Sequence, residues 1–320
     1  MRYVDLGDSR VSIVGLGTRE FGSRTFGDGG ANLSETSKRI LERAIELGVN
    51  LIDTAELYGF GASENLIGSA VSRAPQQAFL ATKILPLSYS RRYLRRRCQK
   101  SLARLRAEVI DLYQIHFPNP IASLELLAES LVGLRESGMV RAFGVSNFGV
   151  AGWDRLEAIS GMRIASNQVR YSLLSRGPER EHLPFAMARD RIIIAHSPLE
   201  QGVLAGKYDR ETRPGGIRRF NRHFSADALE RMQPLLFTLE RVAASHQASA
   251  AQAALAWVIA HPNVVAIPGA SSVAQLEANV AAVEIRLSDQ EIAELDYASD
   301  LYARSTGNRL FRSIRTRAGI

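Results

Sequence analysis

VNLIDTAELYGFGASENLIGSAVSRAPQQAFLATK, residues 49–83, contains one complete repeating unit of the fold. Residues 49–54 and 78–83 are short apolar runs, and residues 63–73 between them place apolar side chains at helical spacing. A strand, a helix and a second strand in this order predict a βαβ unit, whose two strands run parallel.

The same alternation continues along the chain. The predicted strands span residues 11–17, 49–54, 78–83, 109–116, 140–147, 164–169, 191–197 and 263–269. Eight strands, each followed by a helical pattern, predict a (β/α)8 TIM barrel, an α/β fold. A doubly wound sheet is the alternative, but it usually carries G-x-G-x-x-G after its first strand. The segment GLGTREFG has Glu20 in place of the third glycine, so the fingerprint fails.

The chain of 320 residues leaves no stretch for a second domain. We therefore predict a single domain over residues 1–320, with a short N-terminal β-hairpin, a barrel over about residues 11–285 and a C-terminal helix or tail over about residues 286–320. A polar loop at residues 202–224 is predicted to act as a lid or binding loop. The tail after Asp300 either crosses the barrel mouth or frays.

Composition excludes several classes of protein. Hydrophobic residues make up 46% of the chain and charged residues 23%, which is typical of a well-buried core and excludes disorder and fibrous folds. No apolar run reaches the roughly 18 residues of a membrane span, and the N-terminus lacks the apolar core of a secretory signal, so a cytoplasmic location is expected. Cys98 is the single cysteine, which excludes internal disulfides and thiol-pair redox chemistry. The histidines outside the strand ends show no ligand spacing, so no metal is expected.

The net charge of +7 is unevenly distributed. Residues 304–320 hold five arginines and no acid, which leaves only +2 for the rest of the chain. A second cluster comprises Arg91, Arg92, Arg95, Arg96, Arg97 and Lys100. Aromatic residues do not interleave with it beyond Tyr93, so we interpret it as a solvated helix face rather than a nucleic-acid site.

Polar residues gather at the C-terminal ends of the predicted strands, where TIM barrels carry their chemistry. They are Asp53, Lys83, His116, Ser146, Asn147, Asn167, Gln168, His196 and Ser197. Each of these side chains would be buried in the barrel mouth and would need a hydrogen-bonding partner. Core packing does not explain such a set, so we expect a site there.

Tyr58 follows Asp53 by five residues, in a glycine-rich turn. A tyrosine hydroxyl alone is too weak an acid to exchange protons readily near neutral pH. A lysine ammonium about 4 Å away, at an effective dielectric near 20, favours a phenolate by roughly 4 kcal/mol. Asp53 would hold Lys83 charged and His116 would orient a carbonyl oxygen, so the set predicts proton delivery to a carbonyl group.

Motifs in fixed order resemble those of the aldo-keto reductase family. They are DTAELYG with GASENLIG, ATK, QIHFPNP, GVSNF, NQVRYS, SPLEQGVLAGKY and IPGASSVAQLEANV, and the resemblance covers roughly residues 3–300. It implies a TIM barrel that binds NADP(H), with NAD(H) as the alternative, and passes a hydride to an aldehyde or ketone. By the same resemblance Tyr58 is the general acid, supported by Asp53, Lys83 and His116.

The resemblance also implies the residues that hold the coenzyme. Ser146, Asn147 and Gln168 would hold the nicotinamide carboxamide, and His196 stands where relatives usually stack a tyrosine or tryptophan on the ring. Ser197, Leu199 and Gln201 would contact the pyrophosphate. The residues expected near the adenosine are Gly269, Ser271, Ser272, Gln275 and Asn279, and the basic side chains many relatives use for the 2′-phosphate are missing among them. Hydroxyls and a helix N-terminus can still bind a phosphate.

Two alternatives remain open at this point. One is a coenzyme-binding regulatory subunit that resembles the β subunits of voltage-gated potassium channels, with little turnover. The other is an unrelated TIM-barrel hydrolase or isomerase. The expected partner is a small-molecule carbonyl substrate, with neither nucleic acid nor membrane, and the default oligomeric state is a monomer. The substrate depends on loops such as residues 19–33 and 202–224, where Phe21, Phe26, Phe60, Phe117 and Phe220 suggest a partly apolar pocket.

Overall fold

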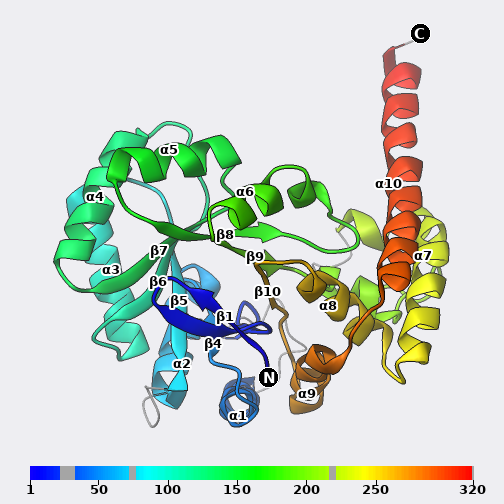
Figure 1. The fold of residues 1–320 in the computed structure, drawn as a ribbon, viewed down its shortest axis with the longest axis horizontal. Coiled ribbons are helices and arrows are strands. Elements are labelled where there is room, and N and C mark those ends of the chain that lie inside the picture. The colour runs from blue at the N-terminus through cyan, green and yellow to red at the C-terminus, as the bar shows by residue number, and fades with distance from the viewer. Residues whose placement is uncertain (22–32, 72–76, 216–220, 319–320) are drawn as a thin grey trace.

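Eight parallel strands form a nearly closed barrel in the computed structural model, which describes residues 1–21, 33–71, 77–215 and 221–318 (Figure 1). In spatial order the strands are β3 (Leu16–Gly17), β4 (Leu51–Asp53), β5 (Phe79–Ile84), β6 (Ile110–Ile115), β7 (Val140–Ser146), β8 (Ile164–Arg170), β9 (Ile192–His196) and β10 (Val264–Ile267). The first and last strands approach each other through parallel bridges from Val14 to Ala266 and from Gly17 to Gly269. The predicted TIM barrel is confirmed.

Glycine is required at this seam. A Cβ atom at Gly17 would lie 2.7 Å from the Ile267 carbonyl oxygen, closer than carbon and oxygen can approach. The seam therefore closes only because this position carries no side chain.

The N-terminal hairpin consists of β1 (Tyr3–Leu6) and β2 (Ser9–Ser12), which pair antiparallel. The predicted first barrel strand at residues 11–17 is therefore wrong in its extent, because the run divides between β2 and the short β3. Apolar side chains in both pieces are buried, so hydrophobicity alone did not separate them. Leu6 and Val11 belong to the same buried cluster as the barrel interior, which places the hairpin against the end of the barrel.

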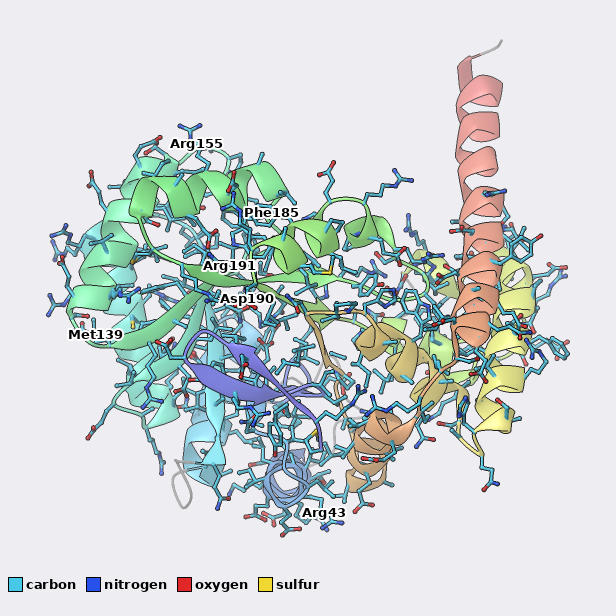
Figure 2. All side chains as sticks on the ribbon, in the orientation of Figure 1. Arg43, Met139, Arg155, Phe185, Asp190 and Arg191 are labelled. Carbon is cyan, nitrogen blue, oxygen red and sulfur yellow. The ribbon has the colours of Figure 1, made fainter. Side chains whose placement is uncertain are left out.

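Helices surround the barrel (Figure 1). They are α1 (Leu33–Glu46), α2 (Ala62–Val71), α3 (Arg91–Leu105), α4 (Leu124–Glu136), α5 (Val150–Ser160), α6 (His182–Ala188), α7 (Ala226–Ser245), α8 (Ala250–Ala260), α9 (Val273–Ala281) and α10 (Asp289–Ala318). Short 3-10 segments are η1 (Tyr58–Gly61), η3 (Gly177–Glu179), η4 (Glu200–Ala205), η6 (Arg222–Phe224) and η7 (Ala282–Glu284). Side chains such as Arg43 and Arg155 project from the outer surface of this helical layer (Figure 2).

The C-terminal extension is one helix, α10, which packs against α7 and continues away from the barrel (Figure 1). Its first half is anchored by hydrogen bonds. Trp257 Nε1 donates to Asp296 Oδ1 at 2.9 Å, and the Tyr302 hydroxyl lies 2.9 Å from His223 Nδ1. As far as Ala318, the last residue that the structure describes, the extension leads away from the barrel rather than across it (Figure 1).

Helix α3 carries the second arginine cluster, and most of its charged side chains are exposed, as expected of a solvated face. Arg97 is the exception. Its Nε donates to the buried carboxylate of Glu56 at 2.7 Å, and Arg104, one helical turn beyond the cluster, pairs in the same way with buried Glu64 at 2.6 Å. These pairs tie α3 to the segment around η1 and α2.

Within the described ranges, no helix combines the length and the apolar character needed to cross a membrane.

Candidate active site

A cavity of about 740 Å³ opens at the C-terminal ends of the barrel strands. Asp53 ends β4, Lys83 lies next to the last residue of β5, His116 follows β6 and Ser146 ends β7. Parallel strands bring these ends to one rim, which is why residues far apart in the sequence meet there. A volume of this size is typical of a small-molecule or coenzyme site.

Asp53, Lys83 and Tyr58 form a hydrogen-bonded chain at the base of this cavity. Lys83 Nζ lies 2.5 Å from Asp53 Oδ1, 2.8 Å from the Thr54 carbonyl oxygen and 3.3 Å from the Tyr58 hydroxyl. Lys83 is fully buried, whereas Asp53 and Tyr58 line the cavity. Burial opposes the ammonium form, but the Asp53 carboxylate and Tyr58 outweigh it, and the pKa of Lys83 is raised.

Two buried amides hold the other oxygen of Asp53. Gln168 Nε2 donates to Asp53 Oδ2 at 2.7 Å and Gln114 Nε2 donates to it at 3.2 Å. Gln114 is not among the site residues predicted from the sequence. Its position two residues before His116 on one strand was the available signal, since alternate strand residues face the same side.

The turn that carries Tyr58 has an unusual backbone. Gly59, Phe60 and Gly61 have φ values of +57°, +53° and +94°, in the left-handed region. A Cβ atom at Gly61 would also lie 2.6 Å from the Arg104 side chain. The turn redirects the chain so that residue 58 faces the cavity before α2 begins.

His116 lies beside Tyr58, with the two ring centroids 5.9 Å apart in an edge-to-face arrangement. Burial, with further contributions from the positive charges of Lys83 and Arg19, lowers the pKa of His116 to about 3. The imidazole is therefore neutral at pH 7. Its Nδ1 atom is buried and has no hydrogen-bond partner in the part of the chain that the structure describes.

Most of the residues expected to hold the coenzyme line the same cavity. They are Ser146, Asn147, Gln168, His196, Ser197, Leu199, Gln201, Gly269, Ser271, Gln275 and Asn279. Ser272 is not among the lining residues. Its hydroxyl accepts a hydrogen bond from the Gln275 backbone N–H and caps α9, so the side chain serves the helix end.

Several polar groups of this set already form hydrogen bonds within the protein. Ser146 Oγ donates to the Gln168 carbonyl oxygen at 2.9 Å, and Asn279 Nδ2 donates to the Gly269 carbonyl oxygen at 3.2 Å. His196 lies near Asn147, at 3.5 Å between Nε2 and Oδ1. Burial, followed by the charge of Lys83, lowers the pKa of His196 to about 3.

The segment η4 forms one wall of the cavity with a tightly coiled backbone. Glu200, Gln201 and Gly202 all have positive φ. The Glu200 side chain is fully buried, and its Oε1 accepts from Arg170 Nε at 2.8 Å and from Ser172 Oγ at 2.8 Å. This ion pair, which was not predicted from the sequence, holds the wall in place from behind.

The predicted binding loop at residues 202–224 contributes Gly202, Ala205, Lys207 and Tyr208 to the lining, and its residues 216–220 lie outside the described chain. Of the three described phenylalanines expected at the pocket, one lines it and two do not. Phe117 lines the cavity, but Phe21 is buried in the core and Phe60 points into solvent, 93% exposed. Phe26 and Phe220 lie outside the described residues.

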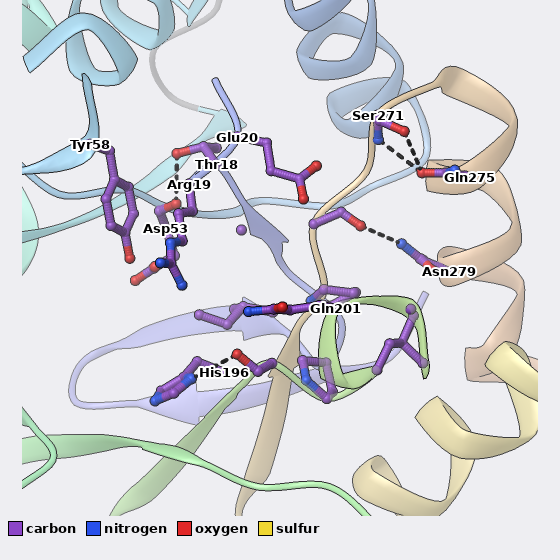
Figure 3. Close-up of a pocket in the computed structure, with 18 of the residues that line it drawn as sticks. Thr18, Arg19, Glu20, Asp53, Tyr58, His196, Gln201, Ser271, Gln275 and Asn279 are labelled. Carbon is purple, nitrogen blue, oxygen red and sulfur yellow. Dashed lines mark hydrogen bonds between the residues drawn. The ribbon is translucent and has the colours of Figure 1, made fainter. Parts of the chain in front are cut away.

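Charged residues at the cavity wall were also missed from the sequence. Arg19 and Glu20 follow β3 and line the cavity, as does Lys207. Arg19 is drawn at the end that holds Tyr58 and Asp53, whereas Glu20 extends toward the end formed by Ser271, Gln275 and Asn279 (Figure 3). A Cβ atom at Gly269 would lie 3.8 Å from a Glu20 carboxylate oxygen.

Among the described residues, no group of three or more His, Cys, Asp or Glu side chains could hold a metal ion.

Comparison with known proteins gives consistent matches. The sequence model of the aldo/keto reductase family matches residues 14–300. An uncharacterized oxidoreductase of Mycobacterium tuberculosis is 44% identical over 98% of each chain. A methylglyoxal reductase of Escherichia coli is 34% identical over 91% of this chain and 92% of its own length. A second enzyme of Escherichia coli, an NADH-specific methylglyoxal reductase, is 31% identical over 91% of this chain and 96% of its own length.

Solved structures agree with these matches. The glycerol dehydrogenase of Gluconobacter oxydans superposes with a TM-score of 0.85 at 29% identity, covering 94% of this chain and 95% of the other. A reductase of the same family from Klebsiella pneumoniae, in complex with NADP and acetate, superposes with a TM-score of 0.76 at 30% identity, covering 91% and 93%.

Proposed function

This chain belongs to the aldo/keto reductase family, and from that premise we propose that it reduces the carbonyl group of an aldehyde or ketone to an alcohol with a nicotinamide coenzyme. The observation that carries the proposal is the hydrogen-bonded chain from Asp53 through Lys83 to Tyr58, which ends in a hydroxyl that lines the cavity. The coenzyme, when bound, supplies the hydride.

Tyr58 is the proposed proton donor. Its hydroxyl would give a proton to the carbonyl oxygen, and the Lys83 ammonium 3.3 Å away would stabilise the phenolate that remains. Asp53 balances the ammonium charge, and its second oxygen accepts from Gln114 and Gln168, so the lysine is held in one position. Because these charges are held in place before the reaction, little free energy is needed to reorganise them while the proton moves.

His116 is proposed to orient the substrate. Because its pKa is lowered to about 3, the ring carries one proton at pH 7 and can donate a single hydrogen bond to the carbonyl oxygen. A neutral donor polarises the carbonyl group without competing with Tyr58 as the acid.

The remaining cavity fits a dinucleotide held by polar groups. Ser146, Asn147 and Gln168 are proposed for the carboxamide, His196 for the face of the ring, and Ser197, Leu199 and Gln201 for the pyrophosphate. Gly269, Ser271, Gln275 and Asn279 are proposed for the adenosine end, and Ser272 would act only through the N-terminus of α9. The main support is that all of these except Ser272 line one continuous cavity with Tyr58.

The phosphate form of the coenzyme is a separate question. NADP(H) is the form predicted from the family resemblance, and the Klebsiella structure holds NADP. NAD(H) is the alternative for two reasons. One relative is named as NADH-specific. Among the described residues, the lysine and arginine side chains that line the cavity are those of Lys207 and Arg19. Neither lies on the segment from Gly269 to Asn279.

The decisive experiment measures NADPH and NADH consumption against a panel of aldehydes, ketones and sugars, with methylglyoxal included because two relatives bear its name. Tyr58→Phe is assayed beside the wild type. We expect turnover to fall by about two to four orders of magnitude while coenzyme affinity, measured by fluorescence titration, is retained. Unchanged rates in the variant would remove Tyr58 from the proposed role.

The same assay tests the regulatory alternative. Tight coenzyme binding by the wild type with negligible turnover across the panel would favour a subunit that resembles those of potassium channels. A cytoplasmic location and a monomeric state remain predictions, to be checked by cell fractionation and by light scattering.

A further inference from the structure

The chain between β4 and Tyr58 is attached to β5 beyond the end of the barrel strand. The Thr54 N–H donates to the Ala81 carbonyl oxygen at 2.8 Å, and the Glu56 N–H donates to the Lys83 carbonyl oxygen at 3.2 Å. These bonds continue the parallel pairing of β4 with β5. The position of Tyr58 therefore depends on how this continued pairing ends.

A side chain completes the last step of the pairing. In a regular parallel ladder the backbone carbonyl oxygen of Glu56 would accept the N–H of Leu85, two residues beyond Lys83. Here the Leu85 N–H donates to Glu56 Oε1 at 2.7 Å. The backbone meanwhile turns, because the Tyr58 N–H donates to the Ala55 carbonyl oxygen at 3.0 Å. The Glu56 carboxylate thus holds the chain at the point where it leaves the sheet.

Helix α3 holds both partners of this bond from behind. Glu56 Oε2 lies 2.7 Å from Arg97 Nε and 2.6 Å from Arg97 Nη2. The hydroxyl of Tyr93, one turn earlier on α3, donates to the Leu85 carbonyl oxygen at 2.9 Å. The Glu56 side chain is 1% exposed, and a charged hydrogen bond shielded in this way is stronger than a neutral one. The ion pair therefore resists displacement of residue 56.

The bond between Glu56 and Leu85 joins the two proposed reacting side chains through short stretches of chain. Leu85 lies two residues after Lys83, and Glu56 lies two residues before Tyr58. The distance of 3.3 Å from Lys83 Nζ to the Tyr58 hydroxyl is already long for a hydrogen bond. Lys83 is also held by Asp53, so a shift of the chain at residue 56 would move the phenol away from the ammonium.

We propose that Glu56, held by Arg97, is a positioning residue that keeps the Tyr58 hydroxyl in contact with Lys83. Neither Glu56 nor Arg97 is among the described residues that line the cavity, so the pair acts through Tyr58 and not on a substrate. The inference rests on the proposed reductase activity and adds to it the pair that sets the geometry of proton transfer.

Two variants separate the two bonds of the carboxylate. Glu56→Ala removes both, whereas Glu56→Gln retains an acceptor for the Leu85 N–H and loses the charge that pairs with Arg97. Arg97 is 31% exposed, so its charge can turn to solvent and both variants should fold. With the aldehyde that the wild type reduces fastest, we expect kcat to fall by about 10- to 100-fold in Glu56→Ala and by less in Glu56→Gln.

Coenzyme affinity is measured on the same variants. The dissociation constants of NADPH and NADH, obtained by fluorescence titration, should stay within about twofold of the wild-type values, because the coenzyme is proposed to bind elsewhere in the cavity. A fall in kcat with coenzyme affinity retained is the signature of a misplaced proton donor. A general loss of structure would weaken both.

Glu157 provides a matched control at the other end of the barrel. Its Oε1 accepts the Ile164 N–H at 2.7 Å and lies 2.8 Å from Arg191 Nε, and its side chain is 8% exposed. This carboxylate therefore also joins an arginine to a backbone N–H. Ile164 begins β8, whereas the proposed chemistry lies at the C-terminal strand ends. Glu157→Ala should leave kcat within about twofold of the wild-type value.

A double variant tests whether Glu56 acts through Tyr58. If it does, loss of the phenol leaves nothing for Glu56 to position, and the two effects on the rate are not additive. Adding Glu56→Ala to Tyr58→Phe should then change the residual rate of hydride transfer by less than about twofold. A merely structural role would lower that residual rate by the same factor as in the wild-type background.

Hydrogen–deuterium exchange tests the same contact without turnover. Peptides that contain residues 54–61 should exchange faster in Glu56→Ala than in the wild type, because the last step of the pairing is lost. In Glu157→Ala the faster exchange should appear around Ile164. Absence of turnover by the wild type with every aldehyde would count against the reductase, whereas unchanged exchange over residues 54–61 in Glu56→Ala would count against the positioning role.

Three kinetic outcomes would also overturn the inference. One is a kcat of Glu56→Ala within twofold of the wild-type value, and another is an equal fall in Glu157→Ala. The third is a loss of coenzyme affinity that accounts for the whole fall in activity, which would assign Glu56 to the coenzyme site instead.

Discussion

The buried Lys83 side chain affects both the stability of the protein and its proposed chemistry. The desolvation of a buried ammonium is costly, and here Asp53, the Thr54 carbonyl oxygen and the Tyr58 hydroxyl accept its hydrogen bonds. Such a pair adds little net stability over an apolar one, but removing a single partner leaves the other charge buried and unpaired. We therefore attribute the pair to the proposed function of the cavity rather than to folding.

Lys83→Met should therefore lose stability as well as activity. We expect the free energy of unfolding to fall by about 3–5 kcal/mol, because Asp53 remains buried without its cation. Urea unfolding at pH 7 measures this change. The double variant Asp53→Asn/Lys83→Met removes both charges and should recover much of the stability while staying inactive. A single variant as stable as the wild type would contradict the account.

At the scale of elements, close helix packing determines where the site residues stand. Helix α2 lies so near the end of α3 that a Cβ atom at Gly68 would come within 2.6 Å of the Leu105 backbone carbon. The same contact region contains the buried ion pair between Glu64 and Arg104. Because α2 follows directly from η1, this packing supports the turn that carries Tyr58.

Gly68→Ala and Gly152→Ala form a matched pair that tests this contact. Gly68→Ala should destabilise the protein by about 1–3 kcal/mol, because the obstructing atoms are backbone and cannot move aside. Among the described residues, the Phe148 side chain alone lies within 4 Å of a new Cβ at Gly152, inside α5, at 3.6 Å. Gly152→Ala should stabilise by about 0.5–1 kcal/mol through helix propensity. Urea unfolding curves measure the free energy of unfolding of both variants. Equal changes in the two variants would refute the close packing of α2 against α3 as the cause.

For the molecule as a whole, we propose that barrel and extension form one domain, with chemistry confined to one rim. Contacts from α10 to the rest of the chain are made by residues such as Asp296, Ser299 and Tyr302. Beyond them the helix continues away from the barrel (Figure 1). The helical segment that carries most of the C-terminal arginines therefore leads away from the barrel.

Removal of residues 306–320 should leave the site intact. We expect kcat/KM to stay within about twofold and the free energy of unfolding within about 0.5 kcal/mol, as for surface changes remote from a site. The elution salt concentration on a cation-exchange column should fall, because four arginines are lost. A large loss of activity with folding retained would show that the tail reaches the cavity after all.

The sequence by itself determined the barrel and the positions of its central residues. Strand ends predicted from apolar runs fall within two residues of the observed ones for β4 to β9, because most residues of these strands are buried and form short apolar runs. Parallel strands then bring their ends together, so Asp53, Lys83 and His116 could be placed at one rim without coordinates.

Tertiary structure decided which atoms meet there. The apolar run at residues 11–17 divides between hairpin and barrel, since both halves are buried and hydrophobicity does not distinguish them. The sequence predicted no role for Gln114, which donates a hydrogen bond to Asp53 in the folded barrel. It predicted that Ser272 contacts the coenzyme, but the Ser272 hydroxyl accepts a hydrogen bond from the Gln275 N–H at the start of α9. The local sequence pattern indicates which residues are buried and with what spacing. The direction of a side chain and the identity of its partner depend on segments that are distant in sequence and that only folding brings close.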